Sequence, residues 1–118
     1  MEEDIKTAIA ILREWAKINL VCNNYPSPVG MVSITMGGIK ETLNQHHRYQ
    51  VEKIDAIYSI AQLLAEGEFV KTSTDKMGRP LIWHYLRIVI AGNNSYIVIR
   101  EDKKSGNKIL YPIVDYIK

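Results

Sequence analysis

The chain has 118 residues, of which 47% are hydrophobic and 24% are charged, and this composition fits one folded domain rather than a disordered segment. Its formal net charge of +2 is too small for the dense basic field of a dedicated DNA-binding domain, but an RNA-cleaving enzyme needs only a local positive pocket. The single cysteine, Cys22, excludes an internal disulfide, so the fold does not depend on an oxidising compartment.

The first half of the chain is predicted to be mainly helical. Two segments carry apolar side chains at spacings of three and four, which is typical of helices that pack on one face. Prolines and glycines separate these segments. In chain order, we expect a helix over 3–20, a loop over 22–30, a short strand over 31–36, a turn at Gly37-Gly38, a short helix over 39–45, and a helix over 51–65 with Gly67 as its C-cap.

The second half changes to the two-residue period of β-strands and is rich in β-branched and aromatic residues. In chain order, we expect a strand over 69–72, a loop over 74–80, a strand over 81–91, a turn over 92–94, a strand over 95–101, a loop over 102–107, and a strand over 109–116. Short loops require antiparallel pairing, and Pro112 favours an edge position for the last strand. The predicted fold is α+β, with N-terminal helices packed on a C-terminal antiparallel β-meander.

Candidate chemistry begins just after the Gly37-Gly38 turn, where Lys40, Thr42, His46 and His47 lie close together in the sequence. Adjacent histidines on a helix diverge by roughly 100° and do not chelate one ion as a pair four residues apart could. No stretch approaches the ~18 apolar residues of a membrane span. The sequence therefore predicts neither a metal site nor a cofactor nor a membrane anchor.

The two long strands offer a second group of candidates. Alternation sets Tyr85 and Arg87 opposite His84 on one strand, and it places Tyr96 and Arg100 together on the next. If the aliphatic rows pack on the helices, these two tyrosines and two arginines form one open face, which suits an anionic ligand that bears bases. His84 shares its side with an apolar row, so a hydrogen-bonded core histidine is as consistent with the pattern as a catalytic one.

RNA cleavage without a metal needs a base for the ribose 2′-OH, an acid for the leaving oxygen and cations for the charge on the phosphorane. Histidine suits the two proton transfers because its ordinary pKa lies near neutrality. Lysine and arginine suit the third role. The chain contains these residue types, although many small proteins that are not enzymes contain them too.

The stretch from Ser33 to Asp115 resembles the phage-associated and polymorphic-toxin nucleases of the barnase–EndoU–colicin–RelE superfamily. The order of elements is similar, and each matching motif is short. The residues that carry the resemblance are Ile34-Thr35, Gly38-Ile39-Lys40-Glu41, His46 or His47, the segment from Ile60 to Gly67, His84-Tyr85, the segment from Tyr96 to Glu101, Gly106 and Tyr111.

This resemblance implies a barnase-like RNase fold over 31–118, with 1–30 as a helical extension of one domain. It implies a metal-independent endoribonuclease toxin that cleaves tRNA or other RNA to a 2′,3′-cyclic phosphate. Such a toxin would act in the cytoplasm, as the C-terminal part of a secreted toxin, and would have a cognate immunity protein or antitoxin. Candidate catalytic residues are His46, His47, His84, Lys40 and Arg100, and candidate substrate-binding residues are Thr42, Tyr85, Arg87 and Tyr96. The alternative is a non-catalytic binding module, such as a phage accessory or immunity-like domain, with the same fold.

Overall fold

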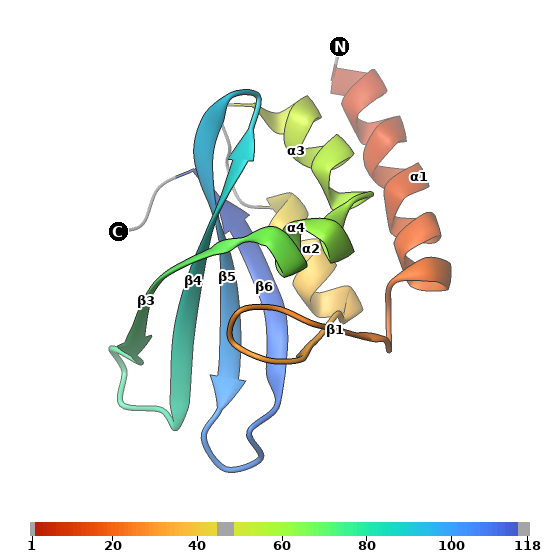
Figure 1. Ribbon diagram of the computed structural model, residues 1–118. Coiled ribbons are helices and arrows are strands. Elements are labelled where there is room, and N and C mark those ends of the chain that lie inside the picture. The colour runs from red at the N-terminus through yellow and green to blue at the C-terminus, as the bar shows by residue number, and fades with distance from the viewer. Residues whose placement is uncertain (1, 45–48, 116–118) are drawn as a thin grey trace.

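The computed structural model describes residues 2–44 and 49–115, and within them it has the predicted α+β architecture (Figure 1). The helices are α1 (Glu2–Asn19), α2 (Met36–Asn44), α3 (Gln50–Ile57) and α4 (Ile60–Glu66). The strands are β1 (Asn24–Tyr25), β2 (Val32–Ser33), β3 (Glu68–Thr74), β4 (Leu81–Ile90), β5 (Asn93–Asp102) and β6 (Lys108–Val114).

The described strands form one six-stranded sheet in the order β1-β2-β6-β5-β4-β3. Strands β3 to β6 are an antiparallel meander, whereas β2 pairs with β6 in parallel through Ser33 and Ile109. The β4–β5 hairpin closes through Ala91 and Gly92, whose φ angles are 53° and 75°. Positive φ at both central residues matches the right-handed twist of the flanking strands, so this turn suits two long paired strands.

The helices cover one side of the sheet, with α1 outermost in Figure 1. Leu12, Ala16 and Leu20 point from α1 and the residues after it into the same apolar cluster as Leu86 and Ile97 of the sheet. The first thirty residues are therefore part of the core that holds the domain together, rather than an appendage beside it. Each fully buried aliphatic side chain contributes about 1.5–3 kcal/mol to folding.

The helix predicted over 51–65 is two helices, which meet at Tyr58 and Ser59. Ile57 and Ile60 on either side of the break are both buried, and the Tyr58 ring lies 4.7 Å from the Trp15 ring of α1. Gly67 caps α4 as predicted, with its N–H bonded to Leu63 O. A side chain at Gly67 would meet Leu86 Cβ at 3.2 Å, so close packing is the reason for glycine here.

The last strand is not at the edge of the sheet, which corrects the interpretation of Pro112. The register of β5 and β6 shifts between Ile97 and Ile99, so β6 carries an extra residue next to Pro112. A bulge of this kind tolerates a residue without a backbone donor. The exposed edge at the far end of the meander is β3 instead.

Helix α2 packs directly against β6. Its glycine pair lies inside the helix rather than in the predicted turn. A Cβ at Gly38 would come within 2.1 Å of Leu110 O, so glycine is what allows the helix to lie this close to β6. The Thr42 hydroxyl donates to Tyr111 O at 2.6 Å. The buried Lys53 Nζ donates to Thr42 O at 2.7 Å. Burial lowers the pKa of Lys53 to about 8, against the opposing attraction of Asp115.

Candidate functional site

The two sides of the meander differ in chemistry because side chains alternate along each strand. The even-numbered residues of β4 from His84 to Ile90 are buried under the helices and loops. The odd-numbered residues face the other side, which no described helix covers. We call this side the open face; its members include Lys71, Trp83, Tyr85, Arg87, Tyr96, Arg100 and Tyr111.

Aromatic rings and cations contact one another on the open face. The ring centroids of Trp83 and Tyr111 are 5.5 Å apart, and Arg100 Cζ lies 5.1 Å from the centroid of Tyr111. Lys71 Nζ lies 5.4 Å from the centroid of Tyr85 on the neighbouring strand. Each of these cation–π contacts is worth about 0.5–1 kcal/mol at an exposed site. The face therefore combines aromatic rings, which suit stacking on planar groups, with cations, which attract anions.

The arginines near this face have different partners. Arg87 is paired with Glu68, and Arg79 in the β3–β4 loop is paired with Asp75. Arg100 has no carboxylate partner among residues 2–44 and 49–115. Its positive charge is therefore the least neutralised of the three and the most available to an anion.

Asp75 organises the β3–β4 loop. Its carboxylate accepts hydrogen bonds from the backbone N–H groups of Met77 and Arg79, from the Arg79 side chain at 3.0 and 3.1 Å, and from Trp83 Nε1 at 3.1 Å. The Arg79 guanidinium, followed by the Trp83 N–H and the Arg79 backbone N–H, holds the pKa of Asp75 well below its usual range although burial acts against it. A carboxylate in this state is a poor proton acceptor.

A groove of about 340 Å³ runs between this loop and β6. Trp83, Tyr85 and Tyr111 contribute its aromatic lining, and Arg79 lies along one wall. Glu41 reaches the groove from α2, because that helix packs tightly along β6. The groove thus brings a carboxylate, a cation and aromatic rings from four separate elements to one place.

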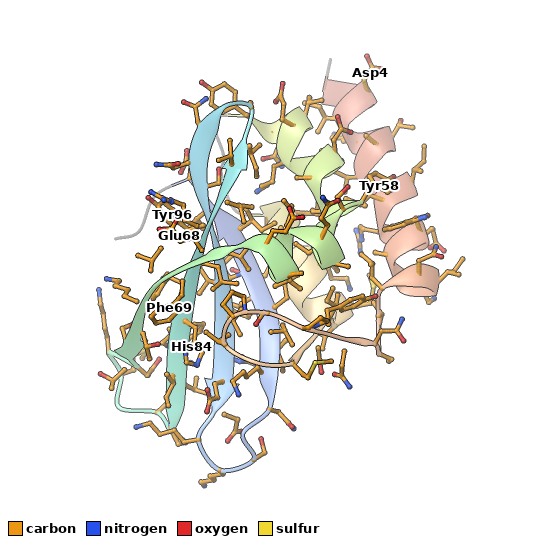
Figure 2. All side chains as sticks on the ribbon, in the orientation of Figure 1. Asp4, Tyr58, Glu68, Phe69, His84 and Tyr96 are labelled. Carbon is orange, nitrogen blue, oxygen red and sulfur yellow. The ribbon has the colours of Figure 1, made fainter. Side chains whose placement is uncertain are left out.

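His84 lies on the helix-facing side of the sheet and not on the open face, in the lower part of β4 in Figure 2. It is 9% exposed, its Nδ1 is 2.8 Å from Thr72 Oγ1, and its Nε2 is 2.7 Å from Glu101 Oε1. Both ring nitrogens are therefore engaged in holding β3, β4 and β5 together. The sheet separates His84 from Tyr85 and Arg100, so it is not part of the open face, and its catalytic role stays a prediction.

Two further predicted residues lie away from the open face. Thr42 is fully buried between α2 and β6, so it has no surface for a substrate and we correct its role to helix packing. Lys40 is exposed on α2 beside Arg13 of α1, in a groove of about 180 Å³ between the helices. His84 and Lys40 are thus not brought together. His46 and His47 lie outside the described residues, and their catalytic role stays a prediction.

The open face includes residues that the sequence interpretation missed. Asp75 and Arg79 lie in a loop, where no periodicity assigns a face. Tyr111 lies on the open face because it alternates with the buried Leu110 of β6. Alternation predicts that Trp83 shares a face with Tyr85 and Arg87, although Trp83 was not among the candidate residues. Among the described residues, no cluster of three His, Cys, Asp or Glu side chains has metal-binding geometry.

No described helix is both long enough and apolar enough to cross a membrane. Neither a curated protein nor a solved structure matches the chain. A protein-family comparison matches residues 3–111 to large polyvalent protein-associated domain 3. The match begins in α1 and ends in β6, so it spans both the helical layer and the open face. The chain belongs to the large polyvalent protein-associated domain 3 family, whose members are domains of large polyvalent proteins.

Proposed function

We propose that this domain is a metal-independent endoribonuclease of the barnase–EndoU–colicin–RelE type, and that its substrate lies on the open face. The observation that carries the proposal is the juxtaposition of Trp83, Tyr85 and Tyr111 with the unpaired Arg100. Stacking on aromatic rings and charge-assisted bonds to phosphate are the two contacts by which proteins hold unpaired RNA. The tRNA preference implied by the sequence resemblance remains part of this proposal.

Arg100 is the proposed phosphate ligand. It lies opposite Trp83 of the paired strand, and its guanidinium is not neutralised by a described carboxylate. A guanidinium binds two phosphate oxygens at once and stabilises the extra charge of a phosphorane. Arg87 is a weaker candidate because Glu68 already pairs with it.

The proton transfers have two sources in this proposal. Glu41 lines the groove, where a carboxylate can accept the proton of the ribose 2′-OH, whereas the lowered pKa of Asp75 makes that carboxylate a poor proton acceptor. His46 and His47 directly follow α2, on which Glu41 lies, so they are the histidines that remain as acid or base candidates.

The test is cleavage of total tRNA in the presence of EDTA, with the products resolved on a gel and their 2′,3′-cyclic phosphate ends identified. Arg100→Ala should slow cleavage by about a hundredfold or more. Glu41→Gln, or a double replacement of His46 and His47 by alanine, should slow it by about 10²–10⁴-fold if that group transfers a proton. The control is Arg13→Ala on α1, which should cleave at the parent rate. Intact tRNA after incubation with the parent protein would end the proposal.

A non-catalytic binding module is the second candidate. It is favoured by one observation, which is that the described part of the open face carries no histidine, since His84 lies on the other side of the sheet. This candidate predicts salt-dependent RNA binding without cleavage products. It also predicts harmless expression, whereas an active RNase should arrest its host unless a cognate immunity protein or antitoxin covers the open face.

A further inference from the structure

The β3–β4 loop joins a cation and an aromatic ring through one carboxylate. Asp75 binds both the Arg79 guanidinium and the Trp83 indole N–H, and its own side chain is only 4% exposed. Two backbone N–H groups of the loop complete its hydrogen bonds. Asp75 is thus buried by the groups it orients and offers little surface to a ligand.

Arg79 keeps free donors in this arrangement. Its Nε and Nη2 atoms donate to Asp75, yet a guanidinium has five N–H groups and the Arg79 side chain is 55% exposed. Arg79 is also one of the residues that line the groove. A fixed guanidinium binds phosphate with a smaller entropy loss than a mobile one.

Trp83 is held in the same way at the groove floor. The hydrogen bond to Asp75 fixes its indole. Its ring centroid lies 5.5 Å from that of Tyr111 on β6, on the same face of the sheet, with β5 between the two strands. The groove volume of about 340 Å³ is at the lower end of the ~300–1,000 Å³ typical of small-ligand sites. It suits one nucleotide, whereas a duplex buries the base faces that stacking requires.

We propose that Asp75, Arg79 and Trp83 form a preassembled subsite for one unpaired nucleotide of RNA. The base lies in the groove against Trp83 and Tyr111, and the adjoining phosphate binds the free N–H groups of Arg79. Asp75 is a positioning residue that acts through the other two. The subsite deepens the proposed nuclease function by naming single-stranded RNA as its substrate class, and it rests on the open face being the RNA-binding surface.

The chain supplies its own reporter for this subsite. It contains two tryptophans, Trp15 and Trp83, and Trp15 lies on α1 against Tyr58. A Trp15→Phe background leaves Trp83 as the sole tryptophan. Titration with a short single-stranded oligoribonucleotide carrying 2′-O-methyl groups, which block cleavage, should quench Trp83 emission to saturation. The same sequence as a duplex should not quench at equal concentration.

Variants then assign the contacts. Arg79→Ala should weaken the binding measured by quenching about ten- to hundredfold, because a charge-assisted contact to phosphate is lost. Arg79→Lys should keep only part of the parent affinity, since lysine has the positive charge but not the planar set of N–H donors that binds two phosphate oxygens. Asp75→Asn should weaken binding in the parent and weaken it less in the Arg79→Ala background, where only its effect through Trp83 remains, whereas a purely structural role would give the same loss in both. Arg13→Ala is the matched control and should bind like the parent.

The outcomes separate this inference from the nuclease proposal. Cleavage of tRNA together with unchanged Trp83 emission, or with parent-like binding by Arg79→Ala, overturns the subsite and leaves the nuclease intact. Quenching that depends on Arg79 in a protein that cleaves no RNA supports the subsite and rejects the nuclease. Equal quenching by duplex and single strand overturns the assignment to unpaired nucleotides.

Discussion

Two neighbouring residues of β4, His84 and Tyr85, show how differently the two sides of one sheet are used. His84 is enclosed by Thr72 and Glu101 on the helix-facing side, whereas Tyr85 lies beside a lysine on the open face. One side is a packed interior that sets stability, and the other is a half-exposed array of rings and cations. On a strand, a shift of one residue therefore decides whether a side chain packs in the interior or lies on the open face.

Replacement of a core residue on the interior side should have the largest effect on the free energy of unfolding. Leu86 is fully buried under the helices, so Leu86→Ala should lower the free energy of unfolding by about 2–5 kcal/mol. Its neighbour Tyr85 faces the groove, and Tyr85→Ala should cost about 1 kcal/mol or less while weakening RNA binding. Urea unfolding followed by circular dichroism measures both. A Tyr85 variant as unstable as Leu86→Ala would contradict the division of roles.

The buried Lys53 gives the interior side a pH dependence. Its pKa is lowered to about 8 in the folded protein from 10.5, so the unfolded chain binds more protons between these values. The free energy of unfolding should therefore rise with pH through this window, by about 2 kcal/mol from pH 8 to pH 10. Lys53→Met should remove this rise, and urea unfolding of parent and variant at the two pH values tests it. Parallel curves for the two proteins would refute the assignment.

His84→Ala tests directly whether His84 is a structural or a catalytic residue. Loss of the contacts to Thr72 and Glu101 should lower the free energy of unfolding by about 1–2 kcal/mol, because Glu101 is left partly buried without its hydrogen bond. RNA binding and cleavage per folded molecule should not change. Thermal unfolding and the tRNA assay, run well below the melting temperature, give the two readouts. Abolished cleavage in a well-folded variant would return His84 to the catalytic site.

Arg87 offers the smallest and most selective change on the open face. Its pair with Glu68 is exposed, so Arg87→Ala should alter stability by less than about 1 kcal/mol. If Arg87 contacts a phosphate, the slope of log affinity against log salt should fall by about one in magnitude, uniformly across RNA sequences. Filter binding at several salt concentrations measures the slope. An unchanged slope would show that Arg87 does not contact a phosphate and that other cations make the phosphate contacts.

Sequence periodicity was sufficient for the meander and for four residues of its open face. Alternation along β4 and β5 places Tyr85, Arg87, Tyr96 and Arg100 on one face, independently of how the helices pack. The same alternation places His84 on the side of the aliphatic residues. The helix break at Tyr58 could not be predicted in this way. Ile54, Ile57, Ile60 and Leu64 continue one helical stripe across it, and neither proline nor glycine marks the position.

The remaining errors have tertiary causes. Thr42 is polar and lies near other polar residues, and only the close approach of Gly38 to β6 buries it. Pro112 favours an edge in any isolated strand, but a bulge accommodates it in the interior of this sheet. The Asp75–Arg79–Trp83 group depends on how a loop folds back on β4, which the local pattern does not specify.

The place of β6 in the sheet order bears on how the domain is completed during synthesis. This strand is made last, yet it lies between β2 and β5 and provides the only ladder that connects them among the described strands. Until β6 leaves the ribosome, the β1–β2 hairpin has no sheet to join and α2 has no strand to pack against. One wall of the groove is also missing at that stage. A chain truncated before residue 108 should therefore lack the groove, and the open face should be complete only after β6 has been translated.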